Sequence, residues 1–350
     1  ISKDSLSPLL TQNKNNYFLG FPFSAYLNES SKKNIDSTFN SWLKKNKKRK
    51  LKLIDVFSQK QIDQIKKYKT DFNQWKIKNG EKLELIDSIK TKISIENLKS
   101  FYKNNGYFNS EIKTKTIFDL KNNNYGKVVY NIDLGNQYYL DSIKTNIKSK
   151  VLDSIYKKNK SYSFLKKNNP FNTLDFESER NRLNKLFKNS GVYNFQINSI
   201  SFELKMDTTA IDLSIPVTIN ILDNKSNNDL LNYNLKYKLH YIKKINVYTN
   251  GIEKLKNNDL KNFISYNGIT IYSVGDLSYK PIILAKLIAI KKDSLYSDLI
   301  RSKTINQLNN FENFQYPSIS YNYLSNSNSE LEANILLVPK KKFSLGFGID

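Results

Sequence analysis

Few side chains of this 350-residue sequence have the chemistry of a catalytic or metal-binding group. His240 is the only histidine, and its place at the start of an expected strand indicates a structural role. Cysteine is absent, which excludes disulfides, thiol catalysis and cysteine metal sites. No cluster of His and carboxylate residues has the spacing of a metal site.

Two further patterns are of kinds that enzymes use. Asp175, Glu177 and Glu179 would lie in the first turns of a helix, where carboxylates complement the helix dipole. Gly346 and Gly348 lie in an alternating strand pattern, whereas a phosphate loop needs a strand-to-helix turn. We therefore predict that the chain is not an enzyme, with no catalytic residue, no metal and no cofactor.

A strong positive charge is the remaining chemical feature. The formal net charge is +24, yet only four of the 56 basic residues are Arg, the residue that suits phosphates and guanine best. Lys is spread almost throughout, beside abundant Asn and Ile, which is also typical of a compositional habit of a genome. The run 44–52 is concentrated enough to contact anionic lipid or an acidic partner, or else it is a solvated connector. Its candidate contact residues are Lys44, Lys45, Lys47, Lys48, Arg49 and Lys50.

One local pattern occurs three times and predicts the organisation of the chain. Each copy has an apolar pair three residues apart, a capping residue five residues later and an apolar residue six further on. This indicates a helix end, a left-handed cap and a strand. The capping residues are Gly106, Gly191 and Asn313. Recurrence of one unit predicts an array of similar domains.

The residues around the second copy complete the unit. Strands are predicted at 139–147 and 193–203 with two helices between them, and alternating apolar residues over 211–221 predict a further strand. The order strand, helix, helix, strand, strand defines an α+β module. Pro216 lies in the last strand, where its missing N–H predicts an unpaired side or a bulge.

The ends of the chain depart from this unit. Residues 34–89 have helical spacing and predict a helical insertion in the first unit, before a strand at 107–116. The third unit should end with strands at 314–323 and 331–338. Residues 343–349 alternate apolar with small or polar residues, as a barrel strand facing lipid does. No apolar stretch approaches the ~20 residues of a membrane helix and no signal peptide is visible, so we expect a soluble chain.

The module resembles the polypeptide-transport-associated (POTRA) domain of BamA/TamA outer-membrane assembly proteins, over nearly the whole chain. The resemblance is clearest from Tyr139-Leu140-Asp141-Ser142-Ile143 through Pro170-Phe171 and Glu179-Arg180-Asn181-Arg182-Leu183 to Gly191-Val192-Tyr193. The first unit resembles one branch, the TamL lipoproteins of Bacteroidota. That likeness rests on Gly20-Phe21-Pro22, Asn34-x-Asp36-x-x-Phe39-x-x-Trp42-Leu43, and Phe72-Asn73-x-Trp75 with Gly80-Glu81.

The resemblance implies three tandem POTRA-like modules. They span 1–136, with its first strand missing and an insertion at about 34–89, then 137–224 and 225–339; residues 340–350 would begin a barrel strand. The family also has a lipidated cysteine upstream of the first strand and a large C-terminal β-barrel. We therefore expect the periplasmic portion of a longer, membrane-anchored protein.

The resemblance also implies a function and partners. The chain would be the periplasmic arm of an outer-membrane protein assembly or translocation factor, docking partner or client polypeptides by strand addition and surface contacts. The implied partners are a TamB-like periplasmic protein, unfolded outer-membrane polypeptides and the chain's own barrel, with no nucleic acid. In POTRA sheets the second strand lies on an edge, which points to 107–116, 193–203 and 314–323. The candidate docking residues are Phe108, Ser110, Ile112, Asn194, Gln196 and Asn198.

Two other hypotheses remain. A basic protein that binds nucleic acid or another polyanion through Lys44–Lys52 would bind with a steep salt dependence. A secreted adaptor without a barrel would have the same modules and no membrane role.

Overall fold

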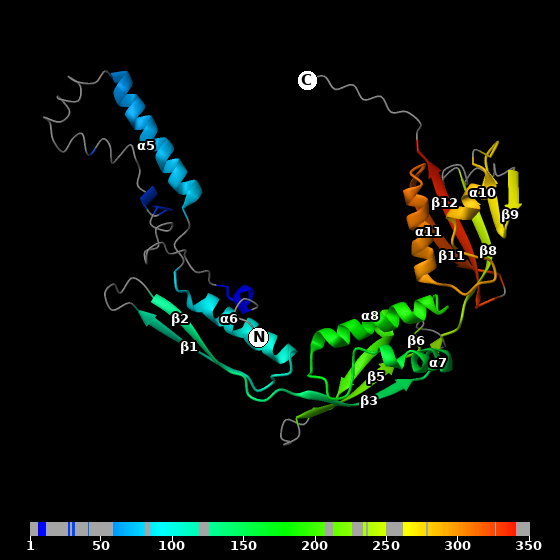
Figure 1. Cartoon of the computed structure of the whole chain (residues 1–350), viewed down its shortest axis with the longest axis horizontal. Coiled ribbons are helices and arrows are strands. Elements are labelled where there is room, and N and C mark those ends of the chain that lie inside the picture. Colours follow the sequence, from blue (N-terminus) through cyan, green and yellow to red (C-terminus); the bar gives the residue numbers. More distant parts are fainter. Residues whose placement is uncertain are drawn as a thin grey trace. The chain divides into compact units, whose positions relative to one another are not determined.

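The computed structural model describes residues 6–11, 27–28, 30–31, 41, 59–80, 85–118, 126–206, 213–225, 234–235, 237–249, 262–277, 279–325 and 327–340. The chain divides into two compact units. One consists of Ile1–Lys103 and Tyr107–Asn136, and the other of Asn104–Gly106 and Gln137–Asp350. Figure 1 shows the helices and strands of both.

The first unit has helices and a two-stranded sheet. Its elements are η1 (Ser7–Leu9), α5 (Gln59–Asn79), α6 (Ser88–Asn104), β1 (Glu111–Phe118) and β2 (Gly126–Asp133). β1 and β2 are antiparallel, and Ile112 of β1 packs with Leu98 and Tyr102 of α6 in the core. Within the described residues the predicted helical insertion therefore contains α5. The predicted strand 107–116 begins later, at Glu111.

The middle module, residues 139–221, has the predicted order of elements. These are β3 (Tyr139–Ile147), α7 (Lys150–Lys158), α8 (Thr173–Asn189), β4 (Ile200–Leu204) and β5 (Ser214–Ile221). The sheet order is β3-β5-β4, with β3 parallel and β4 antiparallel to β5. The second strand of the module therefore lies at an edge.

The core of the middle module follows from sequence periodicity. Alternate residues of β5 are buried, as a period of two predicts for a strand with one face on the core. Leu183 and Phe187 of α8 are also buried, and their spacing of four places them on one helix face. This face lies against the sheet, along which α8 runs in Figure 1.

Pro216 is accommodated at the end of a ladder. Its carbonyl accepts the N–H of Lys205 at 3.1 Å, so its own nitrogen also faces the β4 side of the strand. Since β4 ends at Leu204, the missing N–H affects only this terminal position. On the other side of β5, the pairing with β3 shifts register between Leu140 and Ile143. A central strand thus tolerates proline, because the lost donor that its position predicted falls at the end of the β4 ladder.

The last module, residues 241–339, has the same order plus a hairpin. Its elements are β8 (Tyr241–Tyr248), α10 (Pro281–Leu287), α11 (Asp298–Asn310), β11 (Phe314–Tyr323) and β12 (Glu330–Pro339). The hairpin is β9 (Asn262–Tyr266) and β10 (Ile269–Ser273). The sheet order is β11-β12-β8-β10-β9, with β8 parallel to both of its neighbours. Two short strands, β6 (Asn224–Lys225) and β7 (Asn234–Leu235), pair between the modules in sequence.

Two of the three predicted left-handed caps are observed. Gly106 and Gly191 have φ angles of 86° and 105°, and in both copies the next N–H donates to a carbonyl of the last helical turn at 3.0 Å. The third prediction was wrong by one residue, because Glu312 has φ 58° and Asn313 does not have a positive φ. α11 ends one residue earlier relative to its apolar pair, and the cap moves with the helix end.

Candidate docking edges

β4 is an open edge of the middle module. The Ser199 carbonyl accepts the N–H of Leu222, directly after β5, at 3.0 Å, and the Lys205 N–H donates to the Pro216 carbonyl of β5 at 3.1 Å; these two bonds fix the alternation of the ladder. The N–H and C=O groups of Phe202 and Leu204 therefore point away from β5, as does the C=O of Ile200, whose N–H donates to the Ile197 carbonyl. Such a row of unpaired groups can bind an incoming extended chain through main-chain hydrogen bonds.

Apolar side chains accompany this edge. Phe202 contacts the ring of Phe176 at 5.3 Å between centroids, and the Arg180 guanidinium lies 5.4 Å from its ring centre. Leu204 and Met206 are 37% and 39% exposed. α8 therefore supports the start of β4, whereas the end of β4 presents apolar side chains together with free main-chain groups.

The predicted docking residues before β4 lie outside the strand. Asn194 and Gln196 precede a 3-10 turn, η3 (Ile197–Ser199), which contains Asn198. The reason is Phe195, which is buried against the rings of Phe187 and Tyr237 at 4.8 and 5.1 Å and so turns this segment into the core. The predicted strand 193–203 was wrong in its first seven residues, because extended pairing begins only at Ile200.

The corresponding residues of the first unit are placed similarly. Phe108 and Ser110 precede β1 and are partly buried. Ile112 is within β1, but its side chain is 9% exposed and belongs to the core. The structure therefore brings these residues to the start of an edge strand without placing all three on it.

The third predicted edge, β11, is largely covered. Its pairing with β12 shifts register between Gln315 and Ser318, where Tyr316 has φ 47° and is 92% exposed. Pro317 lies in the same bulge and has no N–H to offer. Further along, the Tyr193 hydroxyl of the middle module donates to the Tyr321 carbonyl at 3.4 Å. Bulges and prolines are common protections of edges, and here a neighbouring module adds a third.

Tyr193 belongs to an aromatic junction between the middle and last modules. Its ring centroid lies 5.0 to 6.1 Å from those of Tyr296, Tyr321, Tyr323 and His240. The backbone joins the modules as well, since the His240 N–H donates to the Gly191 carbonyl at 2.8 Å. Burial raises the pKa of Tyr296 and Tyr321 well above the ordinary value, so both phenols stay neutral.

His240 has the structural role that its sequence position predicted. It is 1% exposed, and its Nδ1 lies 3.3 Å from both the Tyr193 nitrogen and the Gly191 carbonyl oxygen. Burial lowers its pKa, and the charge of Lys238 acts in the same direction, although hydrogen bonds to the Gly191 and Lys238 backbone oppose the shift. The neutral ring is therefore the form that the junction accommodates.

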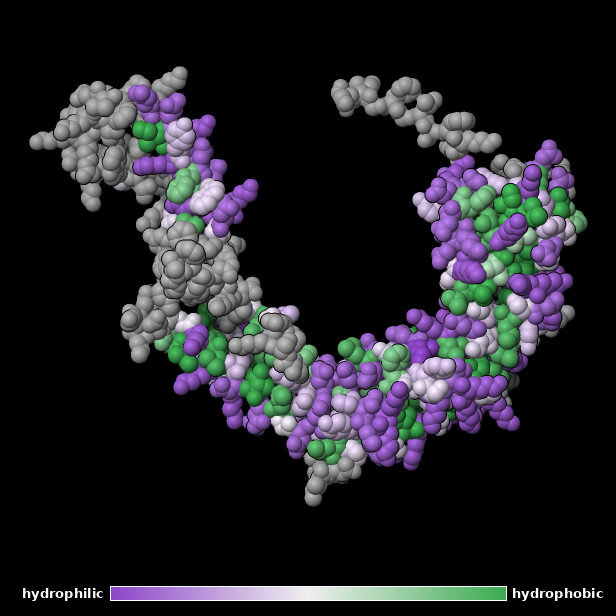
Figure 2. Space-filling model, in the orientation of Figure 1, coloured by the Kyte–Doolittle hydropathy of each residue, from purple (hydrophilic) through white to green (hydrophobic). Residues whose placement is uncertain are grey.

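A further edge, β9, was missed by the sequence predictions, which left 250–279 without regular structure. All five of its residues are exposed, including Phe263, Ile264 and Tyr266. Figure 2 shows hydrophobic residues gathered at this end of the last module. The available signal was Asn267-Gly268, with φ 47° and 79°, a pair typical of two-residue hairpins.

Two of the predicted segments cannot be compared with the described structure. The basic run Lys44–Lys52 lies outside the described residues, as does the alternating segment 343–349. Within the described part of the chain, no group of three or more His, Cys, Asp or Glu residues could hold a metal ion. Among those same residues, no helix combines the length and the apolar character needed to cross a membrane.

Comparison with known proteins gives similar solved structures but no sequence match. No protein-family model matches the chain, and no curated protein matches it significantly. POTRA domains 3–5 of Haemophilus influenzae BamA are similar at 13% identity and a TM-score of 0.34, over 73% of this chain and 84% of that one. Haemophilus ducreyi BamA lacking POTRA domains 1–3 is similar at 9% identity and a TM-score of 0.38, over 58% of this chain and 30% of that one.

POTRA domains 1–3 of Anabaena Omp85 are also similar to this chain, at 10% identity and a TM-score of 0.25, over 75% of this chain and 84% of that one. At such identities and TM-scores the likeness assigns neither a family nor a function to this chain. Its α+β modules are defined by their own strand order and pairing.

Proposed function

We propose that this chain is the periplasmic, POTRA-like arm of an outer-membrane protein assembly factor, and that it docks extended polypeptides by strand addition on β4. The open main-chain groups of Phe202 and Leu204, with the Ile200 carbonyl, support this most directly, because strand addition needs unpaired N–H and C=O groups and little sequence complementarity. In this proposal the chain is not an enzyme.

The finer parts of the proposal follow the sequence resemblance. The modules would be 1–136, 137–224 and 225–339, with 340–350 entering the chain's own barrel in the outer membrane. A TamL-like factor would receive unfolded outer-membrane polypeptides or a TamB-like partner at its periplasmic face. Of the candidate edges, β4 is favoured over β11, whose outward carbonyl at Tyr321 is already bonded to Tyr193.

Leu204→Pro tests the proposal. It removes an outward N–H without removing a bond to β5, so the module should stay folded while capture weakens. The probe is a fluorescently labelled outer-membrane β-barrel protein, unfolded in urea and diluted into the full chain, with anisotropy as the readout. We expect affinity to fall by about threefold to tenfold, as for one main-chain hydrogen bond and the packing around it.

Leu204→Ala is the matched control, because it shortens the same side chain and keeps the N–H. Its affinity should stay closer to that of the wild-type chain than to that of the proline variant. Equal binding by both variants, with unchanged thermal unfolding, would refute docking on β4. A steep loss of binding with salt in both variants would favour the polyanion-binding alternative.

A further inference from the structure

An open pocket of about 550 Å³ lies beside the bulged start of β3 in the middle module. It is walled by β3, the end of α7 and the segment 160–167. Its apolar lining comes from Ile143, Tyr156 and Leu165, and three lysines and several hydroxyl groups complete it. This size suits a small organic molecule, and the lining combines an apolar wall with cationic and polar groups.

The charges around this pocket do not cancel. Asp141, its only carboxylate, pairs with Lys167 at 3.1 Å, and this pairing lowers the pKa of Asp141. The other two lysines, Lys160 and Lys166, are exposed and make no ion pair within the described part of the chain. Two ammonium groups thus remain for an anion.

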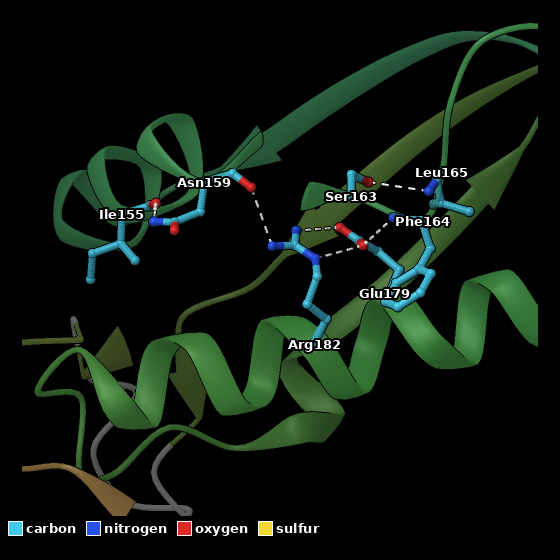
Figure 3. Close-up of polar contacts among 7 residues, drawn as sticks. All are labelled: Ile155, Asn159, Ser163, Phe164, Leu165, Glu179 and Arg182. Carbon is cyan, nitrogen blue, oxygen red and sulfur yellow. Dashed lines mark hydrogen bonds and ion pairs between the residues drawn. The ribbon is translucent and has the colours of Figure 1, made fainter. Parts of the chain in front are cut away.

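The segment that carries these groups is fixed to the fold. Glu179 of α8 is fully buried and accepts two hydrogen bonds from Arg182, at 2.7 and 2.9 Å, and one from the Phe164 N–H at 3.0 Å (Figure 3). Arg182 also donates to the Asn159 carbonyl at 3.3 Å. Because this network holds the segment at Asn159 and Phe164, the positions between them are preorganised, which lowers the entropy cost of binding.

A second fixation joins the other end of the segment to β3. The Asn168 N–H donates to the Leu140 carbonyl at 2.7 Å, and the Leu140 N–H donates to the Asn169 carbonyl at 2.8 Å. The lining therefore has fixed backbone on both sides. The ion pair of Glu179 with Arg182, at 2.7 Å, reduces the repulsion that this buried carboxylate would exert on an anion nearby.

Tyr156 adds an independent observation. It lines the pocket and is 2% exposed, and its hydroxyl has no hydrogen-bond partner among the described residues. A buried hydroxyl without a partner is unfavourable, and a bound ligand or water is a common explanation. Burial, and next the Glu179 carboxylate, raise the pKa of this phenol, so it remains a donor at neutral pH.

We propose that this pocket binds the phosphate group of an organic phosphomonoester, with Lys160 and Lys166 as the charge partners and the apolar wall against the organic part. A phosphomonoester carries up to two negative charges and three terminal oxygens, which match two unpaired ammonium groups and the nearby Ser161 hydroxyl better than a single carboxylate does. Lys acts as a point charge and does not require the planar geometry that Arg imposes. The phosphate could belong to a soluble molecule or to a lipid headgroup.

Calorimetric titration of the full chain with phenyl phosphate tests the site, with benzyl alcohol as the uncharged comparison. We expect phenyl phosphate to bind and the alcohol to bind at least about tenfold more weakly. The double variant Lys160→Gln/Lys166→Gln should lose about tenfold or more in affinity for phenyl phosphate. Lys157→Gln/Lys158→Gln removes the same charge next to the pocket, outside its lining, and should change affinity less than about threefold.

Vesicles of phosphatidylcholine with and without phosphatidic acid separate the two sources. Cosedimentation that requires phosphatidic acid and both pocket lysines would assign a lipid headgroup, whereas binding of phenyl phosphate alone would assign a soluble ligand. The proposal is overturned if phenyl phosphate does not bind, if the alcohol binds equally well, or if the pocket and control variants lose the same affinity. All four substituted lysines are exposed, so unchanged thermal unfolding will confirm folded variants.

Discussion

Glu179 and Tyr156 show how the surroundings of one buried polar residue decide what it does. Glu179 is fully buried, and both of its carboxylate oxygens accept hydrogen bonds, from Arg182 and from the Phe164 N–H. It therefore holds the segment 160–167 in place. Removing one partner of such a pair typically costs about 3–5 kcal/mol. Tyr156 is buried nearby without a partner for its hydroxyl among the described residues, and that difference makes it a candidate for ligand contact.

Two tyrosine-to-phenylalanine variants measure this difference. Tyr156→Phe removes an unpaired hydroxyl and should leave the free energy of unfolding unchanged or raise it by up to about 1 kcal/mol. Tyr237→Phe removes a hydroxyl that lies 2.6 Å from the Ser199 hydroxyl, and should lower it by about 1–2 kcal/mol. Urea denaturation followed by tyrosine fluorescence gives both values. Equal losses would mean that Tyr156 has a partner too.

The helix caps are the clearest case at the scale of elements. Gly191 has φ 105°, and a Cβ there would lie 2.9 Å from Leu295 Cδ2 and 3.2 Å from Leu239 Cδ2. Glycine is thus required by the backbone angle and also by the close approach of neighbouring side chains. The sequence pattern predicted the first requirement, while the second depends on residues about 50 and 100 positions away.

Gly191→Ala should destabilise the chain for both reasons. The backbone angle alone costs about 1–2 kcal/mol for a residue with a Cβ, and displacement of the leucines adds to it. Gly275→Ala is the comparison, since Gly275 has φ 76° and nothing within 4 Å of the added Cβ. Urea denaturation should therefore give a larger loss at Gly191. A loss at Gly275 that is as large would contradict the role of the contacts.

The strands of the modules were predicted well in their order along the chain and less well at their ends. Alternation over 211–221 predicted β5, because one face of that strand meets the core. The strand before it was predicted too long, because Phe195 has the residue type of a strand but is drawn into the core of the module. The hairpin of β9 and β10 was missed, although Asn267-Gly268 marks its turn.

The junction between the middle and last modules acts at the scale of the molecule. It consists of main-chain hydrogen bonds, the ring of Tyr193 among other aromatic rings, and Asn189 of α8, whose side-chain oxygen accepts the Leu299 N–H at 2.8 Å. Aromatic packing and hydrogen bonds in one place make the junction specific. His240 is the only group within it that titrates near neutral pH, as far as the described residues extend.

Acidification should weaken this junction. The folded-state pKa of His240 lies below its ordinary value of 6.5, so between these two values the unfolded or opened state binds more protons. Stability is therefore complete above pH 6.5 and decreases as the pH falls toward the lowered pKa. The facing groups are the phenols of Tyr193 and Tyr323 and, on the same segment, the charge of Lys238; none of them compensates an imidazolium.

Spin labels on exposed residues of the two modules would report this change as a broader distance distribution at pH 5 than at pH 7.5. Lys157 and Lys303, each substituted by Cys, offer sites outside the junction. His240→Gln should remove most of the pH dependence, because glutamine does not titrate. A distribution that broadens equally in this variant would assign the pH effect to other groups.

The sequence by itself determined the α+β module, two of the three left-handed helix caps and the buried strand β5, because these depend on local periodicity and on backbone angles that few residue types adopt. It also predicted the structural role of His240 and the missing donor on one side of Pro216. Only the tertiary structure decided which strand edge stays open, where β4 begins and which lysines remain unpaired around the pocket. These features depend on contacts between residues far apart in the chain, such as Tyr193 with Tyr321 and Asp141 with Lys167, and no local pattern encodes them.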